Sequence, residues 1–200
     1  MLNETLKNHH IILASGSPRR QQFFKELGLD FEIRLKPIKE EFPSRLKHIE
    51  ITDYLAHLKA IPFKDELKAN DILITSDTIV WHNDKALGKP EDELDAFAML
   101  KLLSDSTHEV ITSVCFTTTT FEKTINDITK VTFKNLTDEE INYYIHTCKP
   151  LDKAGAYGIQ EWIGQIAVTN IQGSYFNVMG MPTHLVYKSL IDIVNESQKH

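Results

Sequence analysis

The run Ser-Gly-Ser-Pro-Arg-Arg at residues 15–20 has the composition of a phosphate-binding turn. It follows the short apolar segment 11–14, and Pro18 suits the first turn of a helix that has Ser17 as its N-cap. Backbone amides and the dipole at a helix N-terminus attract anions, and arginine adds bidentate hydrogen bonds to phosphate oxygens. The alternative is an ordinary capped helix whose arginines are solvated. The residues that we predict to bind phosphate are Ser15, Ser17, Arg19 and Arg20.

Two acidic positions follow apolar segments and could serve catalysis. Asp77 comes after the apolar residues 72–74, which predicts a carboxylate at the carboxyl end of a strand. Such a carboxylate can hold Mg²⁺ or Mn²⁺ or orient an attacking water, although a lone aspartate also commonly caps a turn. Glu40 and its neighbour Glu41 follow the alternating segment 31–35 and could add a second hard ligand, or could simply be solvated.

Lysines and a glycine-containing loop complete the candidate set. Lys59 and Lys89 could each meet a phosphate as a point charge, or could belong to the plain surface. The segment 152–160 contains two glycines and two alanines, which permits close approach of its backbone to a ligand or forms a tight structural loop. Gln160 at its end offers a donor and an acceptor, which suits the edge of a nucleobase.

The elements that must position these residues alternate along the chain, which predicts an α/β fold with a mixed sheet. The predicted strands cover residues 11–14, 31–35, 72–74 with an extended continuation at 79–81, 110–121, 125–133 and 166–171. The predicted helices begin at Pro18 and end at Gly28, and cover residues 51–58, 96–103, 141–145 and 185–194. Thr137 and Glu140 form a capping-box pattern ahead of the fourth helix, and Asn83-Asp84 predicts a turn.

Composition excludes several classes of protein. The 200 residues include 42% hydrophobic and 25% charged residues, which is typical of a globular domain. A net charge of −6 argues against general nucleic-acid binding, and no apolar run approaches the ~20 residues that a membrane span needs. The first ten residues lack the pattern of a signal peptide, and the only cysteines are Cys115 and Cys148. We therefore expect a cytoplasmic protein with neither nucleic-acid nor membrane partners.

Read together, these segments resemble the Maf family of nucleotide pyrophosphatases along nearly the whole chain. The matching segments are 13–20, 56–60, 76–80, 87–90, 108–112, 152–160 and 173–182. The resemblance implies one domain over residues 1–200, with a mixed α/β sheet in two lobes flanking a cleft, similar to the inosine triphosphatase-like Maf/Ham1 fold. Members of the family are often homodimers.

The resemblance also implies roles for individual residues. Asp77 matches the proposed catalytic base, and Glu40 and Lys59 match the acidic and basic residues of the same site. Arg19, Thr78 and Gln160 match positions associated with substrate choice, and the intact segment 152–160 resembles the branch that acts on dTTP and UTP. The implied cofactor is Mg²⁺ or Mn²⁺, held by Asp77 and Glu40.

Three positions depart from the family pattern. Thr75-Ser76 replaces the commoner Gly-Ala, and His57 stands where lysine is frequent. Glu161 replaces a usual glycine after Gln160, and we expect this added acid beside the base pocket to shift selectivity or to slow binding.

The residues and the resemblance together predict water attack on the α-phosphorus of a nucleoside triphosphate, with pyrophosphate as the leaving group. Arg19, Lys59 and Lys89 would bind the triphosphate. The alternative is a non-catalytic nucleotide-binding regulator of cell division or septum formation. An aspartyl-phosphate phosphatase is disfavoured because Ile79 occupies the position two residues after Asp77, where such enzymes carry a second aspartate.

Overall fold

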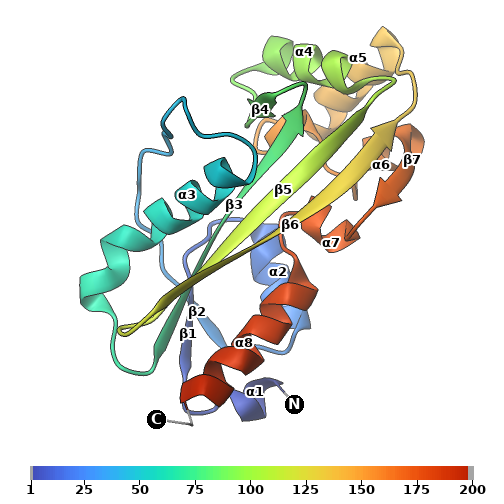
Figure 1. The fold of residues 1–200 in the computed structure, drawn as a ribbon. Coiled ribbons are helices and arrows are strands. Elements are labelled where there is room, and N and C mark those ends of the chain that lie inside the picture. Colours follow the sequence, from blue (N-terminus) through green and yellow to red (C-terminus); the bar gives the residue numbers. More distant parts are fainter. Residues whose placement is uncertain (1, 198–200) are drawn as a thin grey trace. The chain divides into compact units, whose positions relative to one another are not determined.

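The computed structural model describes residues 2–197, and these form one seven-stranded sheet together with helices (Figure 1). The strand order is β2-β1-β3-β5-β6-β7, and β4 pairs with β3. The strands are β1 His10–Leu13, β2 Phe31–Ile33, β3 Asp71–His82, β4 Lys85–Leu87, β5 Thr107–Thr117, β6 Glu122–Phe133 and β7 Val168–Gln172. β1 is parallel to β2 and β3, whereas the β3–β4 and β6–β7 pairs are antiparallel. The predicted mixed α/β sheet is confirmed.

The helices alternate with the strands along much of the chain. The α-helices are α1 Leu2–Thr5, α2 Pro18–Glu26, α3 Ile49–Ala60, α4 Glu93–Leu103, α5 Asp138–Cys148, α6 Trp162–Ala167, α7 Tyr175–Val178 and α8 Thr183–Ser197. Two 3-10 helices, η1 Ile61–Glu66 and η2 Ala154–Ala156, follow α3 and α5. Within residues 2–197, none of these helices has both the length and the apolar composition needed to cross a bilayer.

The chain divides into two compact units, each assembled from segments that are distant in sequence. The first unit comprises residues 2–77, 113–126 and 180–197, and the second comprises residues 78–112 and 127–179. In the first unit, β1 lies between β2 and β3, and α1 contacts α8. Ile12 of β1 and Leu73 of β3 pack with Ala60 and Phe63 in a buried cluster.

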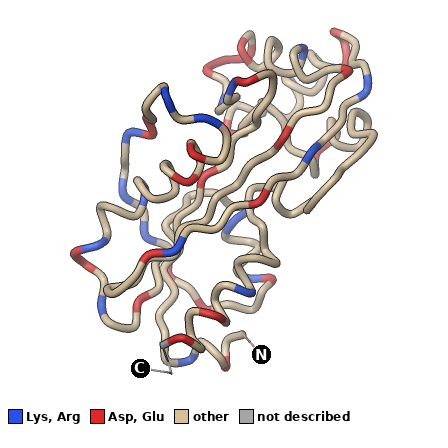
Figure 2. Tube along the Cα trace, viewed as in Figure 1, with Lys and Arg blue, Asp and Glu red and all other residues tan. Residues whose placement is uncertain are grey.

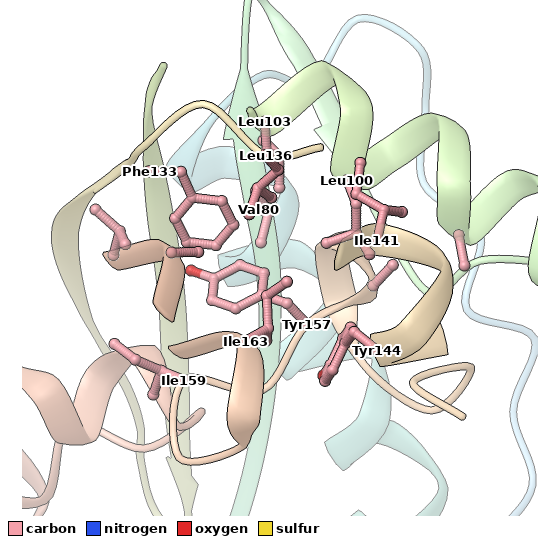
Figure 3. Packing of buried hydrophobic residues seen from close by; sticks show 14 of the residues in the cluster. Val80, Leu100, Leu103, Phe133, Leu136, Ile141, Tyr144, Tyr157, Ile159 and Ile163 are labelled. Atoms are coloured by element: carbon pink, nitrogen blue, oxygen red, sulfur yellow. The ribbon is translucent and has the colours of Figure 1, made fainter. Parts of the chain in front are cut away.

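The second unit has its own apolar core, built by residues from β3, α4, β6, α5 and the segment that leads into α6. Figure 3 shows Tyr157 among Val80, Phe133 and Ile163, with Tyr144 at the same cluster. The Tyr157 and Phe133 rings meet edge to face with centroids 4.9 Å apart. This core supports the segment that ends at Gln160.

Several predicted elements are confirmed because local chemistry fixes them. α2 begins at Pro18, and Gly28 ends it with φ +69°, a conformation that glycine adopts without steric cost. The capping box of Thr137 and Glu140 is present at the start of α5. The turn after β3 is also as predicted, with Asn83 at φ +48°.

Four predictions about strands were wrong. The predicted strand 31–35 ends at Ile33 as β2. β3 does not end at residues 76–78 but continues to His82, because Thr75, between its two apolar halves, finds a hydrogen-bond partner inside the fold, as described below. The predicted strand 110–121 ends at Thr117, and a turn then leads into β6. The first residues of the predicted strand 166–171 belong to α6, so β7 begins only at Val168.

Candidate active site

The turn between β1 and α2 places the predicted phosphate-binding residues at a helix N-terminus. Ser15 is buried, and its hydroxyl accepts a hydrogen bond from the Ser17 amide at 3.3 Å. Ser17 is the N-cap of α2, as predicted, but its side chain makes no capping hydrogen bond. The Gln21 side chain donates to the Ser15 carbonyl at 3.1 Å and so ties the turn to the helix that follows. The turn is thus held by contacts other than a side-chain cap.

Arg20 lies in the first turn of α2, and its guanidinium binds backbone carbonyls. It donates to the carbonyl of Ser76 and to the carbonyl of Gly180, both at 2.9 Å. Burial lowers the pKa of Arg20, and Arg19 lowers it too, whereas the nearby carboxylates of Asp77 and Glu40 raise it. Arginine stays protonated in proteins, so Arg20 brings a permanent charge beside these carboxylates. Its two carbonyl contacts fix the backbone of β3 immediately before Asp77.

Lys59 joins the two predicted catalytic carboxylates. Its ammonium lies 2.7 Å from Oδ1 of Asp77 and 3.0 Å from Oε2 of Glu40. The Asp77 side chain is only 8% exposed, Lys59 is 16% exposed, and Glu40 is 48% exposed. The neighbouring Glu41 instead pairs with Lys39 at 2.6 Å on the surface. The structure therefore brings Glu40 rather than Glu41 to Asp77 and Lys59.

Asp77 does not lie at the end of its own strand, where the sequence predicts it, but beyond the end of the neighbouring strand β1. Asp77 lies within β3, but β1 pairs with β3 only as far as Leu13 and Ile74. The residues that follow β1 leave the sheet for the turn at Ser15. Asp77 thus lies just past the carboxyl end of β1, at an edge where α/β sheets hold their ligands.

Thr75 was recognised in the sequence only as a departure from the family pattern. Its buried hydroxyl donates to the Ala56 carbonyl of α3 at 2.6 Å. Lys59 is three residues further along the same helix. This contact links β3 to α3, the two elements that carry the ion pair of Asp77 and Lys59. A polar residue inside an otherwise apolar strand is the signal that could have identified it.

The remaining predicted site residues belong to the second unit. Thr78 makes a 2.9 Å hydroxyl–hydroxyl hydrogen bond with Thr112 of β5. Thr112 also donates to the carbonyl of the fully buried Asn177 at 3.2 Å. The Asn177 amide in turn donates to the carbonyls of Val110 and Asp127. Thr78 is thus connected to a buried hydrogen-bond network that sequence analysis did not identify.

The segments that carry Lys89 and Gln160 are joined through their backbones. The Gly155 amide donates to the Gly88 carbonyl at 2.9 Å. Gly155 has φ +66°, and a Cβ atom there would lie 2.7 Å from Cγ2 of Val80, so the segment passes directly over β3. Lys89 and Gln160 are both exposed. Their side chains lie at the surface of the second unit, where a ligand could reach them.

A pair of carboxylates is available for a divalent cation. Acidic and basic residues are interspersed along the described chain (Figure 2), so local charge decides what binds here. Among residues 2–197, no three or more His, Cys, Asp or Glu side chains gather as a metal cage. Asp77 and Glu40 nevertheless lie close together, because both contact the Lys59 ammonium. Mg²⁺ is commonly bound by one or two carboxylates together with water and substrate phosphates, so this donor set fits a cation that arrives with a nucleotide.

Known proteins resemble this chain over most of its length. A family model described as Maf-like protein matches residues 10–193. A dTTP/UTP pyrophosphatase of Flavobacterium johnsoniae is 64% identical over 194 residues, which cover 97% of this chain and 100% of the relative. Proteins with the same description from Christiangramia forsetii and Phocaeicola vulgatus are 56% and 49% identical, and the alignments cover 98% and 94% of this chain and 100% and 97% of those relatives.

A solved structure supports the fold independently. The HAM1 protein from Coxiella burnetii aligns with a TM-score of 0.50 at 13% identity, covering 92% of this chain and 99% of that one. At this identity the likeness concerns the fold alone. It agrees with the predicted inosine triphosphatase-like architecture.

Proposed function

The chain belongs to the Maf-like protein family, and from that premise we propose that it hydrolyses nucleoside triphosphates to the monophosphate and pyrophosphate. Relatives described as dTTP/UTP pyrophosphatases align almost end to end with this chain. We therefore name dTTP and UTP as the substrates. The observation that carries the proposal is the Asp77–Lys59–Glu40 cluster, in which two carboxylates contact one ammonium and to which Arg20 of the predicted phosphate-binding turn lies close.

The chemistry follows from the two oxygens of Asp77. Lys59 holds Oδ1, which leaves Oδ2 to orient a water and accept its proton. The water oxygen forms a bond to the α-phosphorus as the bond from that phosphorus to the bridging oxygen of pyrophosphate breaks. Arg19 and Lys59 neutralise charge on the phosphates, while Arg20 fixes the backbone before Asp77. Lys59 thus both orients the carboxylate and contributes positive charge.

The alternative role of Oδ2 is to hold Mg²⁺ or Mn²⁺ together with Glu40, and the bound cation would neutralise phosphate charge and help orient the triphosphate. Ser15 and Ser17 of the turn would contact phosphate oxygens. In the second unit, we propose that Thr78 and Lys89 contact the substrate and that Gln160 reads the base.

We also propose that the protein is cytoplasmic and that it forms a homodimer. Cys115 is buried and Cys148 half-buried, and both are free thiols, as expected in a reducing cytoplasm. The family resemblance is the basis for a homodimer, and analytical ultracentrifugation would test it.

The first test is product analysis of the purified protein with Mg²⁺ or Mn²⁺ and a panel of nucleoside triphosphates. We expect UMP and dTMP with equimolar pyrophosphate, and loss of turnover when a chelator is added. Binding across the panel without turnover would replace the proposal with the nucleotide-binding regulator. Release of inorganic phosphate in place of pyrophosphate would contradict attack at the α-phosphorus.

Asp77→Asn tests the catalytic assignment directly. We expect kcat to fall by about 10²–10⁴-fold, the usual contribution of a general base, with little change in nucleotide affinity. Glu40→Gln should also lower kcat, whereas Glu41→Gln is the matched control because Glu41 pairs with Lys39 instead. Near-normal turnover in Asp77→Asn, or equal losses in the two glutamate variants, would contradict the mechanism.

A further inference from the structure

Glu161 follows the proposed base-reading residue Gln160, yet both oxygens of its carboxylate contact other side chains of the second unit. Oε2 accepts a hydrogen bond from the Tyr144 hydroxyl of α5, and Oε1 lies 3.2 Å from the ammonium of Lys153. The Glu161 side chain is 23% exposed and that of Lys153 only 8%. A carboxylate bound on both oxygens is not a free acid presented to a ligand. An effect of Glu161 on selectivity, which the sequence predicts, would therefore act through these contacts and not through a free acid beside the base.

Tyr144 connects this carboxylate to the backbone just before Gln160. Its fully buried side chain accepts a hydrogen bond from the Gly158 amide at 3.0 Å while donating to Glu161. Burial and the hydrogen bond to Glu161 raise the pKa of Tyr144, so the hydroxyl keeps its proton. One hydroxyl therefore holds both residues that flank the segment 159–160. Figure 3 shows that Tyr144 is anchored in the apolar core of the second unit.

Close packing leaves the short segment little freedom. A Cβ atom on Gly158 would lie 2.9 Å from Cδ of Glu161, so the carboxylate rests against the Gly158 backbone. The Glu161 amide donates to the Gly158 carbonyl at 3.0 Å, which closes a turn around Ile159 and Gln160. At the start of α6, a Cβ on Gly164 would lie 1.8 Å from the Ile159 carbonyl oxygen. Gln160 is exposed on this tightly held turn.

We propose that Glu161, with Tyr144 and Lys153, is a positioning network that fixes the backbone of Gln160 and thereby sharpens the choice of base. We call these three residues the Glu161 network. The inference rests on the proposed function, because it assigns base reading to Gln160. A polar group that is held rigidly discriminates against a mismatched base, since the mismatch leaves it unpaired. A group on a loose turn can shift to accommodate the mismatch.

The test compares Glu161→Ala with Glu161→Gln and Tyr144→Phe. Kinetics with UTP and CTP should show that Glu161→Ala and Tyr144→Phe lose about tenfold in UTP-over-CTP selectivity, mainly through a higher KM for UTP. Glu161→Gln should stay within about threefold of wild type, because its amide oxygen still accepts from Tyr144. Hydrogen exchange at the Gly158 amide should become faster in Glu161→Ala, which reports the loosened turn directly.

Glu140→Ala is the matched control. Glu140 is also a glutamate of the second unit, and it pairs with Lys134 at 2.7 Å and completes the capping box of α5. Its loss should lower stability without changing base selectivity. An equal loss of selectivity in Glu140→Ala, or unchanged selectivity in Glu161→Ala despite faster Gly158 exchange, would overturn the inference.

Binding measurements with non-hydrolysable UTP and CTP analogues separate this inference from the proposed function. If wild-type protein binds the UTP analogue selectively but turns over no nucleotide, the pyrophosphatase proposal fails. The Glu161 network is then judged by binding alone, and it stands only if Glu161→Ala reduces that preference. Absence of any preference in the wild type would overturn the network's role.

Discussion

At the scale of single residues, the pairing of Lys59 with Asp77 is the central electrostatic contact of the first unit. The Asp77 side chain is only 8% exposed, so removing its ammonium partner leaves a poorly solvated negative charge. We expect Lys59→Met to lower the free energy of unfolding by about 3 kcal/mol, the usual result of breaking a buried pair. Asp77→Asn in the Lys59→Met background removes the unpaired charge and should recover much of this loss. Chemical denaturation of the four proteins of this cycle measures the coupling.

The matched control is the pair Lys64 and Glu122 in the same unit. Nζ of Lys64 lies 2.9 Å from Oε2 of Glu122, but the lysine side chain is 41% exposed. Screening by solvent should limit the coupling in the Lys64→Met and Glu122→Gln cycle to about 1 kcal/mol or less. Equal coupling in the two cycles would mean that burial does not strengthen the contact between Lys59 and Asp77.

At the scale of elements, Gly155 and Gly28 allow conformational strain to be separated from close packing. Both have positive φ, +66° and +69°, but a Cβ on Gly28 would meet nothing within 4 Å, whereas one on Gly155 would clash with Val80. We expect Gly28→Ala to cost about 1 kcal/mol of stability from the backbone alone. Gly155→Ala should cost more, because Val80 or the segment that bears Gln160 must move.

Adding Val80→Ala to Gly155→Ala tests the steric part of this prediction. The double variant should be less destabilised than the sum of the two single variants, since the smaller side chain accommodates the new methyl group. Denaturant unfolding measures all four free energies. Strict additivity would show that Val80 is not the obstacle, and equal costs for Gly28→Ala and Gly155→Ala would exclude close packing as the cause.

Elements were predictable from the sequence where local chemistry decides them. Pro18 and Gly28 bound α2, and Thr137 with Glu140 begins α5, because these signals act within a few residues. β3 was wrongly interrupted at residues 76–78, because the hydroxyl of Thr75 is satisfied by α3, a contact that only the tertiary fold supplies. Periodicity cannot reveal such a partner.

At the scale of the whole molecule, the candidate site too combines residues that the sequence can suggest with contacts that only the tertiary fold supplies. The residue types predicted Asp77, Glu40 and Lys59 separately, and the fold brings these three together. Nothing in the residue pattern connects Arg20 with the carbonyls of Ser76 and Gly180. Residue type does not reveal a contact to a backbone carbonyl, so the sequence could suggest which side chains carry chemistry but not which side chains position the backbone around them.

The stability of the whole molecule should depend on pH through His108. Burial lowers its pKa to about 3, with a smaller contribution from His82. Its Nε2 lies 2.8 Å from the Tyr157 hydroxyl. In the unfolded chain a histidine takes up a proton near pH 6.5, whereas the folded state stays neutral, so acidification favours unfolding between these two pKa values. Lowering the pH from 7.5 to 5 should therefore remove about 2 kcal/mol of stability through this one residue.

His108→Gln isolates that contribution, because glutamine can still bond to Tyr157 but does not titrate. The variant should be less stable than wild type at pH 7.5, since it packs less well against the Phe133 and Tyr157 rings. Its stability should then fall less steeply towards pH 5, so that the gap between the two proteins narrows by about 2 kcal/mol. Urea denaturation at several pH values measures both curves. Parallel curves would mean that His108 gains its proton as readily in the folded protein as in the unfolded chain, which its burial in the core of the second unit should prevent.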